Sequence, residues 1–361
     1  MKYYILAGEA SGDLHGSHLI KALKQNDARA ILYAWGGDKM QSAGALIRKH
    51  YRELAFMGFI EVIQNIGTIL KNFNYCKKDI AEFKPDALIL IDYPGFNLRM
   101  ASWAKKNGYK VFYYISPQVW AWKADRVKII RSSVDKMYTI LPFENEWYSK
   151  YKVYPKFVGH PLLEELKSFV PDASLKNKYA NKKIIALLPG SRKQEISKML
   201  PVYLQAVKSF QDYTPVIAAA PSQSIGFYQS IIKEMDIDIV QNKTYEILSI
   251  ASLAWVSSGT ATLETALFNV PQVVCYKGNS LSYYIARRLV NVQYISLVNL
   301  ILERPVIPEL IQFGFTAETL IKTTQELNLN QIKEDYSRLY HLLLPDNASE
   351  QVAHSIINEI Q

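Results

Sequence analysis

Short apolar runs alternate with amphipathic helical patterns along most of the chain. An apolar, aromatic-rich run that ends at a glycine or a polar residue is typical of a buried strand. In the first half, such runs predict strands at residues 3–7, 30–34, 87–91, 110–114, 136–140 and 156–158. Helical patterns lie between most of them. Repeated β-α units of this kind predict a parallel, doubly wound sheet.

A second α/β series follows a break at Gly159-His160-Pro161. Its predicted strands are residues 184–188, 214–219, 237–240, 253–256, 272–276 and 294–297. A chain of 361 residues is too long for one core of ordinary size. We therefore expect two Rossmann-like α/β domains, over residues 1–165 and 166–345. A terminal helix over 346–361 can pack on either domain.

The composition is that of a folded chain with a basic surface. Apolar residues make up 49% and charged residues 21%, and 42 Lys and Arg against 33 Asp and Glu give a net charge of +9. This charge favours anionic partners such as phosphates or an anionic membrane surface. The absence of a dense basic run argues against a nucleic-acid arm. The two cysteines lie far apart, and neither a signal peptide nor a membrane-spanning run is evident, so we expect a cytoplasmic protein with at most peripheral membrane contact.

The polar residues after the first predicted strand are candidates for chemistry. Glu9, Ser11 and Asp13 place two carboxylates and a hydroxyl in one short turn, before a helical pattern over 14–23. In an open α/β sheet, this carboxyl edge of the first strand is where ligands bind. Capping of the helix by Ser11 or Asp13 is the structural alternative. Two acids exceed what a cap needs, so we predict that the turn orients or activates an acceptor.

Asp92 ends a strongly apolar strand and is expected at the same sheet edge. Burial raises the pKa of a carboxyl group toward neutrality, which suits a general base. The alternative is a turn aspartate that bonds its own backbone. Gln118 and Trp120 lie in a loop after the next strand. We expect them to line a sugar or acyl pocket, or else to close the domain core.

Two glycine-containing turns in the second half are typical of a nucleotide-diphosphate site. Backbone amides at a turn that opens a helix suit phosphate, and Arg192 adds a bidentate donor. Glu264, about one turn into the second of these helices, is placed to accept hydrogen bonds from a ribose. An ordinary capped turn is the alternative for each motif alone. The predicted donor-site residues are Gly190, Ser191, Arg192, Ser258, Gly259, Thr260 and Glu264.

A broad apolar face at helical spacing runs through residues 56–78. Most such helices face the core, but lysines at its end also suit a helix exposed to lipid. The predicted lipid- or acceptor-facing residues on it are Met57, Phe59, Val62, Ile63 and Ile66. No histidine, cysteine and acid cluster has metal-ligand spacing, and neither a Walker loop nor a Gly-x-Gly-x-x-Gly fingerprint follows the first strand. We therefore expect no metal and no cofactor.

Taken together, the strings resemble the lipid-A-disaccharide synthase family over nearly the whole chain. They are GEASGD at 8–13, MGFIEV at 57–62, SPQVWAW at 116–122, LPGSR at 188–192, SGTATLE at 258–264 and YISLVNL at 294–300. The resemblance implies a GT-B fold, with two Rossmann-like domains facing across a cleft. It also implies inverting, metal-independent transfer from UDP-2,3-diacylglucosamine to 2,3-diacylglucosamine 1-phosphate (lipid X), which yields the β-1,6-linked disaccharide 1-phosphate and UDP.

The resemblance also implies roles for individual residues. Asp92 matches the family's proposed base, Glu9 a second required carboxylate, and Asn299 a polar residue near the donor. Many relatives carry another acid where this chain has Gly95, so we expect Asp92 to carry the role of base. Family members lie peripherally on the cytoplasmic face of the inner membrane, and some form homodimers that exchange C-terminal segments.

Two other functions remain open from the sequence. One is a different sugar-nucleotide enzyme of the same fold, such as a UDP-N-acetylglucosamine epimerase or the transferase of lipid II synthesis. The other is a nucleotide-responsive lipid-binding protein without catalysis. The apolar face at 56–78 and the loop at 116–122 favour a diacyl substrate over the first alternative.

Overall fold

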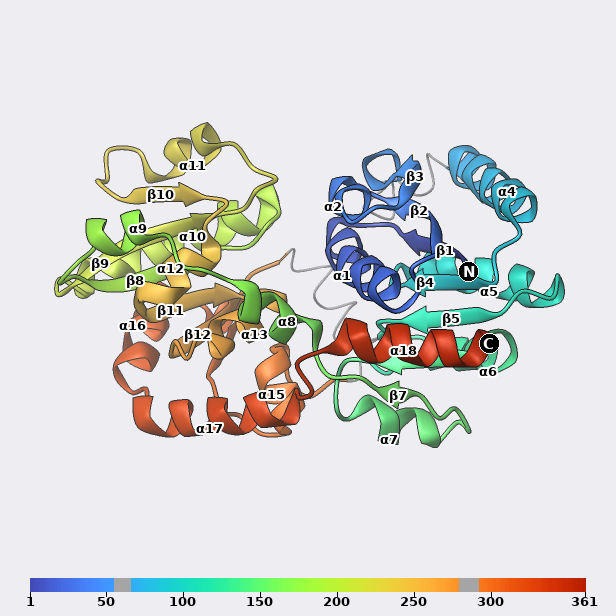
Figure 1. Ribbon diagram of the computed structural model, residues 1–361. Coiled ribbons are helices and arrows are strands. Elements are labelled where there is room, and N and C mark those ends of the chain that lie inside the picture. The colour runs from blue at the N-terminus through green and yellow to red at the C-terminus, as the bar shows by residue number, and fades with distance from the viewer. Residues whose placement is uncertain (55–65, 279–291) are drawn as a thin grey trace. The chain divides into compact units, whose positions relative to one another are not determined.

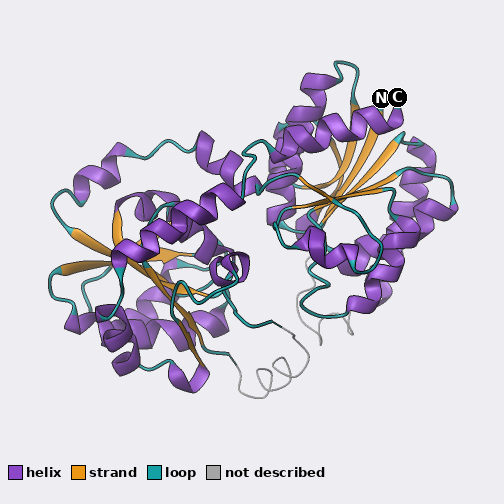
Figure 2. Ribbon diagram, turned by 90° about the horizontal axis from the view of Figure 1, so that it is seen from below, coloured by secondary structure: helices purple, strands orange, loops and turns teal. Residues whose placement is uncertain are grey.

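The computed structural model describes residues 1–54, 66–278 and 292–361 of the chain (Figure 1). It divides into two compact units. Unit 1 comprises Met1–Lys167 and Leu343–Gln361, and unit 2 comprises Ser168–Leu342. Each unit is one parallel β-sheet covered by helices on both faces, which confirms the prediction of two Rossmann-like domains (Figure 2).

Unit 1 is built on a seven-stranded sheet in the order β3-β2-β1-β4-β5-β6-β7. All described strand pairs in it are parallel. Its strands are β1 Lys2–Ala7, β2 Ile31–Gly36, β3 Leu46–His50, β4 Ala87–Ile91, β5 Val111–Tyr114, β6 Lys136–Thr139 and β7 Lys156–Phe157. The strand order reverses between β1 and β4, so the loops after these two strands flank the switch point where ligands bind in such sheets.

Helices cover both faces of this sheet and create two cores. One core joins the sheet to α1 (Ala10–Asn26) and α18 (Ala348–Ile360), and the other joins it to α4 (Ile66–Phe83), α5 (Pro94–Lys106) and α6 (Val127–Ser133). Because both faces of the sheet are covered, the sequences of the central strands are continuous apolar runs. The remaining helices of the unit are α2 Asp38–Ser42, α7 Glu144–Ser149 and α8 Pro161–Ser168, with 3-10 turns η1 Tyr51–Glu53 and η2 Ala124–Arg126.

The last helix of the chain belongs to unit 1. Helix α18, red in Figure 1, packs against α1, and its Val352 and Ile356 are fully buried in the same core as Ile5. A hydrogen bond of 2.9 Å from the His160 amide to the Leu343 carbonyl holds the returning chain beside α8.

Unit 2 repeats the architecture with a six-stranded sheet in the order β10-β9-β8-β11-β12-β13. Its strands are β8 Lys183–Leu188, β9 Tyr213–Ala219, β10 Asp238–Gln241, β11 Ala251–Ser257, β12 Gln272–Tyr276 and β13 Glu309–Ile311. Its helices are α9 Ala173–Lys178, α10 Lys193–Ala206, α11 Ile225–Ile232, α12 Thr244–Ile250, α13 Thr260–Leu267, α15 Leu297–Leu302, α16 Ala317–Gln325 and α17 Leu329–Leu342, with 3-10 turns η3 Val207–Ser209 and η4 Gln312–Gly314. The switch point lies between β8 and β11.

Some elements differ from the sequence predictions. Edge strands β3 and β13 were not predicted, and the strand expected at 294–297 is wrong, because α15 begins at Leu297. Helix α1 begins at Ala10 rather than near residue 14, so Ser11 and Asp13 lie in its first turn. The ranges of the buried strands agree closely with the apolar runs that predicted them.

The predicted apolar helix at 56–78 is described only in part. Met57, Phe59, Val62 and Ile63 lie outside the described residues, and Ile66 begins α4. Farther along α4, Cys76 and Ile80 are fully buried, whereas Leu70 is 54% exposed. The second half of the helix therefore faces the core, and its first half presents apolar surface to solvent.

Candidate functional site

Asp92 stands at the switch point of the unit 1 sheet, directly after β4. Asp92 and Tyr93 both adopt left-handed backbone conformations, with φ of 44° and 49°. Such conformations are unfavourable for residues other than glycine, and they cluster at functional sites, where the surrounding structure must hold them.

Buried donors hold this turn in place. The Asp92 carbonyl accepts hydrogen bonds from the Tyr113 hydroxyl at 2.6 Å and from the Asn97 side-chain amide at 2.7 Å. The Asp92 amide donates to the Tyr114 carbonyl at 3.1 Å. Tyr113 and Asn97 are fully buried, so the backbone of Asp92 is fixed from both sides.

The Asp92 carboxyl group is tuned by its surroundings. Burial, and then the negative charge of Glu9, raise its pKa to about 6, against an opposing hydrogen bond from the Tyr93 amide. Glu9 itself is exposed and precedes α1 without using its side chain as a cap. The structure thus brings the two predicted catalytic carboxylates close enough to interact, at the loops after β1 and β4. A carboxyl group with a pKa near neutrality is suited to accept a proton.

Gly8 allows this close approach of the β1 and β4 loops. A Cβ atom built on Gly8 would lie 2.5 Å from the Tyr93 ring, so no larger residue fits without displacing that ring. Gly95, the second residue of α5, is different: it is exposed, and a Cβ atom there would meet nothing within 4 Å. Packing at position 95 therefore leaves room for a larger side chain, such as the second acid that the family resemblance implies for many relatives.

The structure gives Asp13 a structural role, and its predicted contact with the acceptor stays a prediction. Its carboxylate is buried and accepts hydrogen bonds from the backbone amides of Gly37 at 2.7 Å, Lys39 at 3.2 Å and Met40 at 3.1 Å. It therefore satisfies the free amides at the start of α2. Ser11, by contrast, is exposed on the first turn of α1.

The loop after β5 is tied to α7 by a carboxyl group that the sequence analysis did not single out. Glu144 accepts hydrogen bonds from the Ser116 hydroxyl at 2.6 Å and from the Trp120 indole at 3.1 Å. Burial raises the pKa of Glu144 to about 7, against the hydrogen bond from Ser116. Trp120 is thus half-buried and anchored, whereas Gln118 is exposed. A Glu at the start of a short helix carries no sequence signal for burial, which explains why it was missed.

In unit 2, the turn after β8 leads into α10 at the switch point. Gly190 has a φ of 107°, and Ser191 and Arg192 are exposed. The Arg192 side chain is 74% exposed and contacts Glu195 at 3.4 Å. Ser222 and Gln223 fix the turn through hydrogen bonds to the Ser191 carbonyl at 3.1 and 3.0 Å. The guanidinium group is therefore exposed to solvent, where an anion can compete with Glu195 for it.

The turn after β11 lies on the other side of the same switch point. Gly259 precedes α13 with a φ of 150° and a ψ of −164°, a conformation that is essentially restricted to glycine. Thr260 opens the helix and is exposed, while the Ser258 hydroxyl is engaged by the Ile295 carbonyl at 2.8 Å. Glu264, one turn into the helix, accepts a hydrogen bond from the Tyr245 hydroxyl at 3.2 Å. The turn presents backbone amides and a helix N-terminus, which attract anions.

Asn299, which was predicted to contact the donor, holds a loop together in the structure. It is 1% exposed. Its amide nitrogen donates to the Ile307 carbonyl at 2.8 Å and to Glu309 at 2.9 Å. Its oxygen accepts from the amides of Val306 at 2.9 Å and Ile307 at 3.0 Å. The polar atoms of the Asn299 side chain are therefore hydrogen-bonded to the segment that leads into β13.

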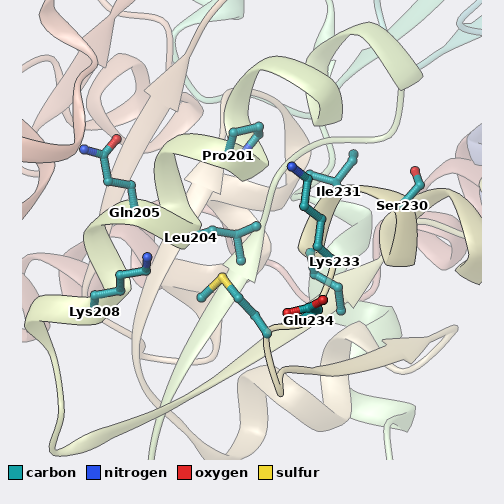
Figure 3. Close-up of a pocket in the computed structure, with 10 residues that line it drawn as sticks. Pro201, Leu204, Gln205, Lys208, Ser230, Ile231, Lys233 and Glu234 are labelled. Carbon is teal, nitrogen blue, oxygen red and sulfur yellow. The ribbon is translucent and has the colours of Figure 1, made fainter.

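The described cavities do not include the predicted catalytic residues. A groove of about 850 Å³ lies between the ends of α10 and α11 and is lined by Leu204, Lys208, Lys233 and Met235, among others (Figure 3). A second cavity, of about 570 Å³, is lined in part by Asn299 and Glu309.

Two further observations concern metals and membranes. Among residues 1–54, 66–278 and 292–361, no group of three or more His, Cys, Asp and Glu side chains is arranged to hold a metal ion. Within the same ranges, no helix has the length and apolar character needed to cross a bilayer.

Sequence comparisons relate the whole chain to one family. A family model described as lipid-A-disaccharide synthetase matches residues 3–359. The lipid-A-disaccharide synthase of Syntrophus aciditrophicus is 40% identical over 364 residues, which cover 97% of this chain and 95% of the relative. That of Coxiella burnetii is 37% identical over 372 residues, covering 99% and 98%.

Structure comparisons support the fold. A glycotransferase of kitacinnamycin aligns over 100% of this chain and 99% of its own, with a TM-score of 0.71 and 12% identity. The UDP-GlcNAc 2-epimerase from Neisseria meningitidis, bound to UDP-GlcNAc, aligns over 99% and 100%, with a TM-score of 0.68 and 11% identity. At these identities the likeness establishes a shared two-domain α/β architecture.

Proposed function

The chain belongs to the lipid-A-disaccharide synthase family, and from its glycosyltransferase activity in lipid A biosynthesis we propose a specific reaction. The donor is UDP-2,3-diacylglucosamine and the acceptor is 2,3-diacylglucosamine 1-phosphate. The acceptor 6-hydroxyl attacks the anomeric carbon of the donor as the bond to UDP breaks. The products are the β-1,6-linked disaccharide 1-phosphate and UDP, with inversion at the anomeric carbon.

The observation that carries this proposal is the environment of Asp92. Attack by a sugar hydroxyl needs a base, and a carboxyl group with a pKa of about 6 is largely ionised at neutral pH yet basic enough to accept the proton. Its rigid, left-handed backbone keeps the carboxylate in a fixed position. Glu9, whose charge contributes to that pKa, is assigned to orient the acceptor.

We assign the UDP group to unit 2. Arg192 and the amides at the start of α13 supply positive charge to the diphosphate, on which negative charge grows as the bond breaks. Glu264 is assigned to the ribose hydroxyls. Solved structures with this fold, such as S. aureus MnaA with UDP and the epimerase with UDP-GlcNAc, bind uridine nucleotides, which favours a UDP-sugar donor. This arrangement needs no divalent metal.

We assign acyl chains and the membrane surface to the start of α4. Leu70 is 54% exposed there, and the chain carries a net charge of +9. Exposed apolar side chains on a basic protein favour peripheral binding to an anionic bilayer. We therefore place the enzyme on the cytoplasmic face of the inner membrane.

The test is a reaction of the purified protein with both diacyl sugars in the presence of EDTA, followed by mass detection. We expect the disaccharide 1-phosphate and UDP in equal amounts. UDP release without disaccharide would contradict transfer to this acceptor, and a requirement for added Mg²⁺ would contradict metal independence.

A further inference from the structure

Two cationic side chains, Lys123 and Arg126, lie over the ring of the exposed Trp122 in the loop between β5 and α6. Trp122 is 48% exposed. The Lys123 ammonium lies 4.4 Å from the centroid of its ring, and the Arg126 guanidinium carbon lies 5.6 Å from it. The indole face attracts each cation, but the two like charges repel each other. Such a pair is favoured when an anion binds between its members.

Among residues 1–54, 66–278 and 292–361, no acid is an ion-pair partner of either cation. Among the described ion pairs and hydrogen bonds, no carboxylate partner is found for Lys123 or Arg126, and Asp125, which stands between them in the sequence, takes part in none. Elsewhere in unit 1, by contrast, Arg48 of β3 forms an ion pair with Asp79 of α4 at 2.7 Å. The charge at the β5 loop is therefore available to a ligand.

Hydrogen bonds to buried groups of α7 fix the conformation of this loop. Ile115 and Lys123, near its two ends, have left-handed backbone conformations, with φ of 62° and 58°. Buried groups of α7 hold the segment between them. Glu144 accepts hydrogen bonds from Ser116 and Trp120, and the Tyr148 hydroxyl donates to the Pro117 carbonyl at 2.9 Å. Strain held by buried anchors is a feature of functional loops.

The same loop adjoins Asp92. Strands β4 and β5 pair directly, with Ile91 opposite Tyr114, so Asp92 and Ile115 leave the sheet side by side. The positive charge of Arg126 acts on the Tyr113 hydroxyl, which donates its hydrogen bond to the Asp92 carbonyl. The cation pair and the assigned base therefore share one sheet edge of unit 1.

We propose that Lys123 and Arg126, arranged on Trp122, bind the phosphate monoester of the sugar acceptor. This inference rests on the proposed function, which places the acceptor hydroxyl at Asp92. A phosphate monoester carries nearly two negative charges at neutral pH, which matches two adjacent cations. Arg126 supplies a planar, bidentate donor and Lys123 a point charge. The pair thereby makes a 1-phosphate a requirement for efficient acceptors.

The test compares two acceptors, 2,3-diacylglucosamine 1-phosphate and the matching methyl glycoside without phosphate. The test variant is K123N/R126Q, because asparagine tolerates the left-handed backbone of Lys123. The matched control is K128A/R131A, which removes the same charge from exposed positions on α6. We expect the test variant to raise KM for the phosphorylated acceptor about 10- to 100-fold and to change KM for the methyl glycoside by less than about twofold. The control should change neither value.

Other outcomes overturn the inference. An equal loss with both acceptors would show that the cations do not recognise phosphate. If the K123N/R126Q variant no longer sediments with phosphatidylglycerol vesicles but still prefers the phosphorylated acceptor to the methyl glycoside, the two cations bind the membrane surface instead. If the wild-type protein forms no disaccharide from either acceptor, the proposed function fails. The phosphate site can then still be tested by titrating the phosphorylated acceptor and measuring the change in tryptophan fluorescence, with the W122F variant as the control.

Discussion

The side-chain amide of Asn97 donates a hydrogen bond of 2.7 Å to the backbone carbonyl of Asp92. It also donates to the carbonyl of Ile91 at 3.1 Å, so one buried side chain spans the end of β4 and the left-handed turn. The position of the Asp92 carboxylate therefore depends on a residue that does not itself reach solvent.

Replacing Asn97 with alanine should impair both folding and catalysis. The change removes the donor that Asn97 supplies to the Ile91 and Asp92 carbonyls, although Tyr113 still donates to the latter, so we expect the free energy of unfolding to fall by about 1–3 kcal/mol. We also expect kcat to fall at least tenfold at a temperature where the variant is folded. Denaturant unfolding and steady-state kinetics measure the two effects. Asn107→Ala, at the exposed end of α5, is the control and should cost less than about 1 kcal/mol. Wild-type kcat in Asn97→Ala would show that Asp92 does not depend on this anchor.

Asp92→Asn should inactivate the enzyme while stabilising it. Burial raises the Asp92 pKa from 3.8 to about 6, so the folded state binds this proton more tightly than the unfolded state. The cost of ionising the carboxyl is absent below pH 3.8, grows through the window between 3.8 and 6, and is fully present above it. At pH 7.5 we expect the variant to be more stable by about 1–3 kcal/mol. Urea unfolding at pH 7.5 and pH 4 tests this, and the gain should shrink at the lower pH. A destabilised variant at pH 7.5 would show that the carboxylate is stabilised by its surroundings.

Arg192→Ala should weaken UDP binding without affecting the fold. Because the side chain is 74% exposed, we expect little change in Tm, whereas loss of a charge-assisted contact should raise the Kd for UDP about 10- to 100-fold. Isothermal titration calorimetry gives the Kd. Lys208→Ala, just after the other end of α10, removes one positive charge from the same unit and should leave the Kd unchanged. Equal effects of the two substitutions would indicate a nonspecific charge effect.

Asn299→Ala distinguishes a structural role from a ligand contact. Four hydrogen bonds link this buried side chain to residues 306–309, so we expect a loss of about 2–4 kcal/mol in unfolding free energy. Below the variant's Tm, its Kd for UDP should stay within about threefold of wild type. Gln331→Ala, an exposed residue beside the same cavity, is the control for stability. A weakened Kd with an unchanged Tm would restore the donor-contact interpretation.

The sequence predicted the parts of the fold that depend on local apolar pattern. Strand β4 was predicted to the residue, because it is buried on both faces. Strand β3 was missed because Arg48, Lys49 and His50 occupy an edge of the sheet, where charge is favoured and the apolar pattern is lost.

Roles that depend on long-range hydrogen bonds were harder to predict. The position of Asp92 at the sheet edge could be predicted because the residue directly follows a buried strand. Asp13 caps a helix that begins at Asp38, and the buried Glu144 bonds Ser116, partners that no local pattern reveals. The place of a side chain was thus predictable where it follows a strand end, and not where a carboxylate bonds a distant part of the chain.

The pH dependence of kcat/KM for disaccharide formation tests the central assignment most directly, because it reports the protonation of the free enzyme. If Asp92 is the base, its carboxyl must be ionised, so kcat/KM should fall tenfold per pH unit below about pH 6. Asp92→Asn should lower kcat/KM by about 100-fold or more and abolish this limb of the profile. A wild-type profile that stays flat down to pH 5, or an Asp92→Asn variant that keeps both its rate and the acidic limb, would contradict the assignment of Asp92 as the catalytic base.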